Sequence, residues 1–151
     1  MESPVYAGRP FSAFRIGDTF GSSVTINESH LSRGAELIGD FNPLHVDEAF
    51  ARTSRFGGRV LHGVLTSAVM SAPFGNLVAG TAIGYLEHNT RFLAPVRPGD
   101  TLDIRWTVTA LDPKPHHGGG VVTAECAATN QAHQLVATAT GKMMVADRRG
   151  A

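Results

Sequence analysis

The sequence predicts a single α+β domain in which a curved antiparallel sheet wraps around one long helix. Residues 61–72 are apolar or small almost throughout, so a helix there would be buried on all sides. Later segments rich in Val, Thr and Ile show two-residue alternation and are separated by turn residues, which is typical of consecutive antiparallel strands. These segments are residues 83–96, 101–111, 121–132 and 134–146. Because nothing else in the chain could cover the helix, we expect the sheet to do so.

Length and composition limit the classes of function. A chain of 151 residues predicts one domain, which we place at residues 14–147 between a lead-in (1–13) and a tail (148–151). Equal numbers of basic and acidic residues, 13 of each, argue against a nucleic-acid partner. The single cysteine excludes an internal disulfide and fits a reducing compartment. We see no signal peptide and no apolar run of about 20 residues, so we expect a cytoplasmic protein without a membrane partner.

The first half of the chain predicts a short strand followed by a helix. The strand ends near Ile26, and Thr25 and Glu28 have the spacing of a capping box that starts the helix. One apolar stripe follows, formed by Leu31, Gly34, Ala35 and Ile38. Gly39 provides the left-handed residue that ends such a helix. Asp40 is therefore expected immediately after a helix C-terminus.

A second, shorter helix is predicted from Leu44 to Arg52. Asn42 is a favoured N-cap, and Pro43 at the first helical position loses no hydrogen bond. His45 then lies in the first turn of this helix. A glycine-containing loop, residues 53–59, leads to the long helix, which we expect to end at Pro73.

The spacing of Asp40 and His45 suggests acid–base chemistry. A carboxylate and an imidazole five residues apart, at the ends of two helices, can reach one water molecule together. Taken alone, Asp-x-Asn-Pro is also a common turn-and-cap sequence. The second signal is His62-Gly63 at the start of the long helix, where unpaired N–H groups favour developing negative charge. A glycine there lets a ligand approach the backbone closely.

Four segments together resemble the MaoC-like hydratases, the (R)-specific enoyl-CoA hydratase branch of the hot-dog fold. They occur in that family's order and extend over roughly residues 15–146. The segments read GDFNPLHVD at 39–47, LHGVLT at 61–66, RFLAPVRPGD at 91–100 and GK at 141–142.

The resemblance implies a function and an assembly. The expected reaction is the reversible hydration of a trans-2-enoyl thioester to the (R)-3-hydroxyacyl thioester, carried by coenzyme A or an acyl-carrier protein. The protein would be a hydro-lyase that needs no metal and no cofactor. It would form a homodimer through its sheets, or a larger oligomer of dimers, and the active site would lie near the dimer interface.

The resemblance also assigns roles to individual residues. Asp40 and His45 would be the acid–base pair, and the backbone amide of Gly63 would bind the thioester oxygen. Three residues would have supporting roles: Asn42, Pro43 and His62. For His62, a packed or capping histidine is an alternative to direct participation.

The acyl pocket is less well defined by the sequence. Candidate lining residues are Phe56, Val64, Leu65, Met70 and Phe74, although core packing explains them equally well. Three arginines are candidates to contact phosphates of coenzyme A or to be solvated surface residues: Arg59, Arg91 and Arg97.

Three other residues with reactive side chains are not expected to take part in catalysis. Cys126 is interpreted as a core residue, and His116 and His117 as parts of an exposed loop. A hot-dog thioesterase is the alternative enzyme, but thioesterases of this fold generally lack the Asp-x-Asn-Pro-x-His run. A non-catalytic subunit that binds acyl thioesters is the third hypothesis, against which the presence of both Asp40 and His45 argues.

Overall fold

In the computed structural model, which describes residues 7–148 and 150, five strands form one antiparallel sheet. The order across the sheet is β1-β3-β4-β5-β2, so β1 and β2 are its edges. The strands are β1 (Thr19–Thr25), β2 (Ala82–Phe92), β3 (Thr101–Lys114), β4 (Gly119–Thr129) and β5 (Leu135–Ala146). The predicted strands are confirmed, although the first of the four ends at Phe92. Residues 93–96 continue as an extended segment hydrogen-bonded to Val136.

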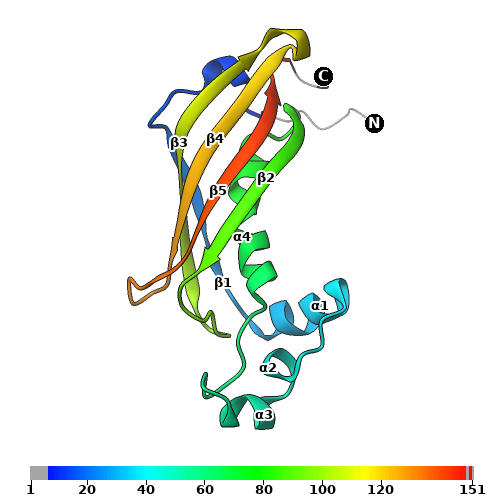
Figure 1. Ribbon diagram of the computed structural model, residues 1–151, viewed down its shortest axis with the longest axis vertical. Helices are drawn as coiled ribbons and strands as arrows, with labels where there is room; N and C mark the ends of the chain where they lie inside the picture. The colour runs from blue at the N-terminus through cyan, green and yellow to red at the C-terminus, as the bar shows by residue number, and fades with distance from the viewer. Residues whose placement is uncertain (1–6, 149, 151) are drawn as a thin grey trace.

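The long helix α4 (Gly63–Leu77) lies along the inner face of the sheet (Figure 1). Its buried residues form one stripe, Thr66, Met70, Pro73 and Phe74. The fully buried indole of Trp106 on β3 donates to the Met70 carbonyl at 2.8 Å, which fixes the helix to the sheet. The α+β architecture predicted from the sequence is therefore confirmed.

Two expectations about this helix were wrong. Pro73 lies inside α4 rather than at its end. A proline removes one helical hydrogen bond, but the buried packing around Met70 and Phe74 retains the following turn. The helix is also not buried on all sides, since Val64 is 61% exposed. A single sheet covers only one face of a helix, so the apolar residues on the opposite face remain uncovered.

The helical segment that precedes α4 lies at one end of the sheet (Figure 1). Its first helix is α1 (Glu28–Ile38), and Gly39 ends it with a left-handed φ of 74°, as predicted. The predicted capping residue was wrong. The side chain of Asn27 caps α1, while Thr25 belongs to β1 and hydrogen-bonds to Thr101 across the strands.

The predicted second helix is two short helices, α2 (Pro43–Val46) and α3 (Glu48–Thr53). The break is at Asp47, whose side chain accepts a hydrogen bond from the Phe50 amide and so starts a new helix. Asn42 caps α2, with its side chain accepting from the Leu44 amide at 3.0 Å.

The N-terminal lead-in is packed against the domain from residue 8 onward. Phe11 and Phe14 are buried in the core, and the Arg9 carbonyl accepts from Thr81. The Ser12 amide donates to Asp147 at 2.8 Å, so both ends of the described chain meet here. Residues 1–6 of the predicted lead-in, and 149 and 151 of the predicted tail, lie outside the described residues. None of the helices within the described ranges is long and apolar enough to cross a membrane.

Candidate active site

The fold brings Asp40 and His45 together at the end of the sheet. Asp40 follows the left-handed Gly39, and its carboxylate is anchored by the Asn42 amide at 3.0 Å. His45 Nε2 lies 3.9 Å from Asp40 Oδ2. This separation is too long for a direct hydrogen bond, but an oxygen atom about 2.8 Å from each group fits between them. The carboxylate is about half exposed and the imidazole largely buried, so a water molecule can reach the pair from the carboxylate side.

A backbone contact orients the His45 ring. Its Nδ1 lies 2.7 Å from the carbonyl of Val60, which can only accept. Nδ1 therefore carries the hydrogen, and Nε2, which faces Asp40, presents its lone pair in the neutral ring. Both Asp40 and His45 are then hydrogen-bond acceptors toward a shared water molecule.

His62 connects the parts of this site. Its side chain is fully buried, and its Nε2 donates to the Asp40 carbonyl at 2.9 Å. Its ring stacks on that of His45, with centroids 3.8 Å apart. The His62 carbonyl also accepts the first hydrogen bonds of α4. His62 Nδ1 is buried without a hydrogen-bond partner among the described atoms. The contacts thus place His62 between the acid–base pair and the start of α4.

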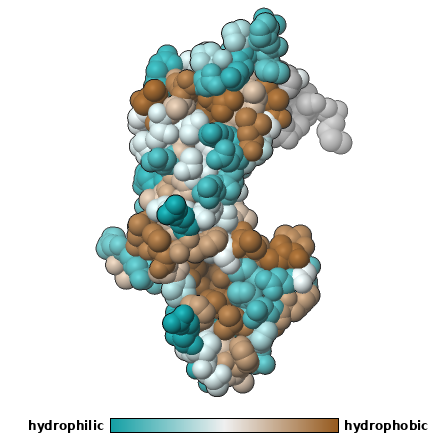
Figure 2. Space-filling view, in the orientation of Figure 1, coloured by the Kyte–Doolittle hydropathy of each residue, from teal (hydrophilic) through white to brown (hydrophobic). Residues whose placement is uncertain are grey.

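Gly63 is the first residue of α4, and its N–H belongs to the helix turn whose amides have no partner within the helix. Gly63 and His45 line the same cavity of about 400 Å³. A Cβ on Gly63 would lie 3.3 Å from the Phe92 ring, so glycine keeps the backbone accessible here. Figure 2 shows apolar side chains gathered where the lower end of the sheet meets the helical segment.

The structure separates the five predicted pocket residues. Phe56 lines the cavity beside His45, whereas Val64 lines a second cavity between α4 and β2. Leu65 points at Gly34 of α1. Met70 and Phe74 are fully buried in the core and do not line the cavity beside His45, because they lie on the α4 face that packs against Trp106.

Sequence reasoning missed part of the lining. The extended segment from Phe92 to Val96 forms one wall, and the buried side chain of Thr66 also lines the cavity. The motif at residues 91–100 was the available signal for that wall. Tyr85 and His88 of β2, which share a hydrogen bond at 2.7 Å and line the second cavity, were also missed.

A metal ion was not expected, yet one trio of ligands deserves comparison with the acid–base interpretation. Asp40, His45 and His62 each offer one ligand atom within 4.8 Å of the others. However, His62 Nε2 and His45 Nδ1 are already engaged with backbone carbonyls. The free ligand atoms are then His62 Nδ1, His45 Nε2 and the Asp40 carboxylate. A cation bound there would occupy the last two, which are the atoms that acid–base chemistry requires.

Two of the three candidate arginines are near the cavity beside His45. Arg59 is paired with Glu28 and Glu48. Arg97 donates to the carbonyl of Phe56 at 2.6 Å, which places its charge beside the cavity lining.

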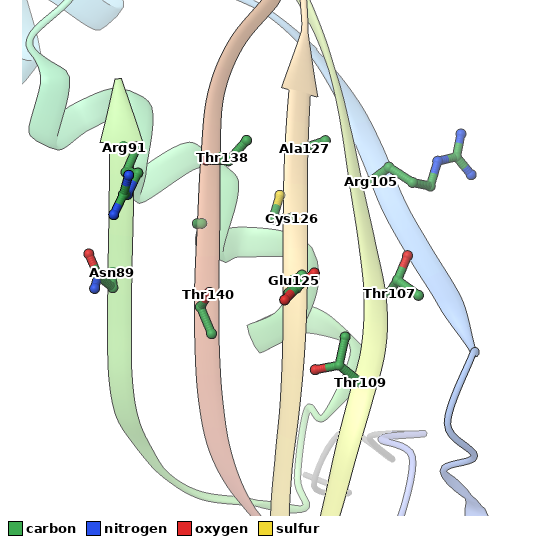
Figure 3. A pocket seen from close by; sticks show the side chains of 11 residues that line it. Asn89, Arg91, Arg105, Thr107, Thr109, Glu125, Cys126, Ala127, Thr138 and Thr140 are labelled. Carbon is green, nitrogen blue, oxygen red and sulfur yellow. The ribbon is translucent and has the colours of Figure 1, made fainter. Parts of the chain in front are cut away.

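Arg91 instead lines a hollow of about 680 Å³ on the outer face of the sheet (Figure 3). Threonines and charges of both signs form this hollow, and α4 lies behind the strands. It includes none of the predicted catalytic residues.

Comparison with known proteins decides the family. The model of the MaoC like domain matches residues 13–131. The chain belongs to the MaoC-like family. The (R)-specific enoyl-CoA hydratase of Rhodospirillum rubrum is 38% identical over 104 residues, which are 69% of this chain and 72% of that protein. The R-hydratase PhaJ1 of Pseudomonas aeruginosa has a TM-score of 0.81 at 30% identity, covering 92% of this MaoC-like chain and 86% of that structure.

A further solved structure is similar to this MaoC-like protein in fold. A Mycobacterium tuberculosis protein described as having a double hot-dog fold superposes with a TM-score of 0.79 at 20% identity. The match covers 95% of this chain and 46% of that one. The resemblance inferred from the four sequence segments is thus confirmed for both family and fold.

Proposed function

We propose that this protein catalyses the reversible hydration of a trans-2-enoyl thioester to the (R)-3-hydroxyacyl thioester. The observation that carries the proposal is the pairing of two hydrogen-bond acceptors, Asp40 and His45, of which His45 lines a largely apolar cavity together with Gly63, the first residue of α4. Hydratases and dehydratases of acyl thioesters among the relatives support the same reaction. They do not favour the thioesterase or a non-catalytic subunit.

The chemistry follows from the orientation of the two acceptors. A water molecule held between Asp40 and His45 donates one hydrogen to each and attacks C3 of the enoyl group with its oxygen. The pair takes one proton from this water and returns a proton to C2, acting as one coupled unit. Charge that builds on the thioester oxygen is stabilised by the Gly63 amide and the helix dipole. Every step uses protons alone, so we propose no metal and no cofactor.

We also propose that two copies pair through the edge strand β2. Apolar residues are exposed along this edge and on the neighbouring face of α4, including Ile83, Leu86 and Val64. Exposed sheet edges with apolar side chains tend to pair with another chain. Light scattering should then give twice the chain mass of 16.0 kDa. A mass of one chain at micromolar concentration would contradict the pairing.

The test of the function is a hydration assay with crotonyl-CoA. Loss of the enoyl absorbance without release of free thiol indicates a hydratase, whereas thiol release indicates a thioesterase. Asp40→Asn and His45→Ala should each reduce the rate by about 10²–10⁴. Asp103→Asn, on the outer face of the sheet, is the matched control and should keep the wild-type rate. A folded Asp40→Asn or His45→Ala protein with near-wild-type turnover would exclude that residue from the mechanism.

A further inference from the structure

The segment of residues 54–60 carries the backbone carbonyl that orients His45, yet it belongs to no helix or strand. It contains two successive glycines, of which the first has a left-handed φ of 67°. Glycines give a loop conformational freedom. The Phe56 carbonyl and the Val60 amide are hydrogen-bonded to neighbouring segments. Between these two points, the position of the segment depends on the side chain of Arg59.

Arg59 joins this segment to two helices. Its Nε donates to the carboxylate of Glu48 at 2.9 Å, and a terminal nitrogen of the same guanidinium donates to Glu28. Glu28 is the first residue of α1, and Glu48 is the first residue of α3. The Arg59 side chain is only 21% exposed, which restricts it to few orientations. One guanidinium therefore bridges two helices and the segment that precedes α4.

The bridged elements are those that position the acid–base pair. Helix α1 ends two residues before Asp40. His45 lies in α2, three residues before Glu48 at the start of α3. The residue after Arg59 is Val60, whose carbonyl lies 2.7 Å from His45 Nδ1. A single side chain thus contacts all three segments on which the geometry of the pair depends.

The bridge is charged, but its main effect is on geometry. The hydrogen bond from Arg59 is the largest reason that the pKa of the Glu48 carboxyl lies below its usual value. Hydrogen bonds to Glu48 and Glu28 raise the pKa of Arg59. Ion pairs between exposed groups add little to overall stability. However, the planar fork of an arginine can hold two carboxylates at fixed angles.

We propose that Arg59 is a positioning residue for the hydration reaction: its bridge fixes the Val60 carbonyl, which holds the His45 ring in the tautomer with hydrogen on Nδ1. The inference rests on the proposed function, because that tautomer presents the Nε2 lone pair to the reacting water. If the carbonyl moves away, the ring is free to carry its hydrogen on Nε2, and the acid–base pair loses one acceptor. A contact of Arg59 with coenzyme A phosphates is opposed by the two carboxylates beside it, since they repel an anion.

The His45 tautomer can be measured without turnover. Long-range ¹H–¹⁵N correlation spectra of protein labelled with ¹⁵N-histidine distinguish the N–H nitrogen from the lone-pair nitrogen at about pH 8, where an ordinary histidine is neutral. The His45 signals are those that are missing in His45→Ala. We expect hydrogen on Nδ1 in the wild type and a larger fraction on Nε2 in Arg59→Gln. The matched control is Arg52→Gln, which removes an exposed arginine from the same Glu48 carboxylate and should keep the wild-type tautomer.

Steady-state hydration of crotonyl-CoA gives the second readout. In Arg59→Gln, kcat should fall about tenfold or more at an unchanged KM, since a misplacement of about 1 Å can cost about 10²-fold. Glu28→Gln removes only the α1 half of the bridge, at an exposed position, and should shift the tautomer and kcat in the same direction. Arg59→Lys keeps the charge but offers one nitrogen to two carboxylates, so it should restore only part of kcat.

The two readouts separate this inference from the proposed function. An unchanged His45 tautomer in Arg59→Gln, or in Glu28→Gln if Arg59→Gln does not fold, would overturn the inference. An increase in KM at an unchanged kcat would assign Arg59 to carrier binding, and equal losses of kcat in Arg59→Gln and Arg52→Gln would assign it to general surface charge; either result also overturns the inference. A tautomer shift in a protein that hydrates no enoyl substrate would instead refute the proposed function and support the link between Arg59 and His45.

Discussion

The contacts of His62 lead to a prediction that separates two roles of one side chain. His62 donates a hydrogen bond to the Asp40 carbonyl and also stacks on the ring of His45. His62→Phe keeps an aromatic ring over His45 but cannot donate to Asp40. His62→Gln keeps a donor of similar reach but removes the ring. The two variants therefore remove one interaction each.

The structure gives the magnitude for the phenylalanine variant. Loss of the donor leaves the Asp40 carbonyl without its partner, a cost of about 1–3 kcal/mol. The same change removes the buried His62 Nδ1, which has no partner among the described atoms, and this relieves a penalty of similar size. The free energy of unfolding should therefore change by less than about 2 kcal/mol, or a few degrees in Tm. Turnover should fall about a hundredfold, because Asp40 is no longer held in position and a shift of about 1 Å is that costly.

The assay combines thermal unfolding by circular dichroism with steady-state hydration of crotonyl-CoA. We expect His62→Phe to lower kcat with little change in KM, and His62→Gln to retain kcat within about tenfold of wild type. A folded His62→Phe protein with wild-type kcat would refute the positioning role. If His62→Gln loses as much as His62→Phe, ring stacking rather than the hydrogen bond holds the site.

Three further predictions concern other parts of the molecule. Gly63→Ala should reduce kcat/KM about tenfold or more, since the added Cβ would meet the Phe92 ring at 3.3 Å. The control is Gly75→Ala in the same helix, whose Cβ would meet nothing within 4 Å and which should leave kcat/KM unchanged. Equal effects of the two substitutions would contradict the oxyanion role of Gly63. The pKa of His88 is lowered by burial in the folded protein, so the unfolded chain binds more protons as the pH falls. The Tm should therefore decrease below a pH of about 6.5, and it should decrease less steeply in His88→Leu. Parallel plots of Tm against pH for the two proteins would refute this. Burial raises the pKa of Cys126 to about 12. A thiol reagent at pH 8 should therefore label this cysteine only after denaturation. Rapid labelling of the native protein would disprove its burial.

Much of the architecture follows from local patterns. Residues Leu102, Ile104, Trp106 and Val108 alternate in the sequence and are all buried on one face of β3. Gly39 was predicted to end a helix because of its conformational freedom, and its φ of 74° agrees. Errors arose where two local signals compete. Thr25 and Asn27 are both suitable caps, and pairing of Thr25 with Thr101 in the sheet decides in favour of Asn27.

The candidate site, like the fold, follows partly from local sequence patterns and partly from tertiary contacts. The sequence places Asp40 and His45 near each other, since five residues and two helix ends separate them. It cannot indicate that His45 Nδ1 meets the Val60 carbonyl or that His62 Nε2 meets that of Asp40, because these contacts join positions 15 and 22 residues apart. These contacts orient the two catalytic candidates and the first turn of α4 relative to one another.

The sequence by itself determined the fold class, the family and the residues proposed to carry the chemistry, because periodicity, caps and short motifs are local properties of the chain. Only the tertiary structure decided which side chains share a cavity. Val64 and Gly63 are neighbours in sequence, yet they line different cavities, since successive residues of a helix point about 100° apart. Tyr85 and His88 become a polar pair only because β2 brings both beside α4. Such groupings depend on how helix and sheet pack, which no local pattern in the chain specifies.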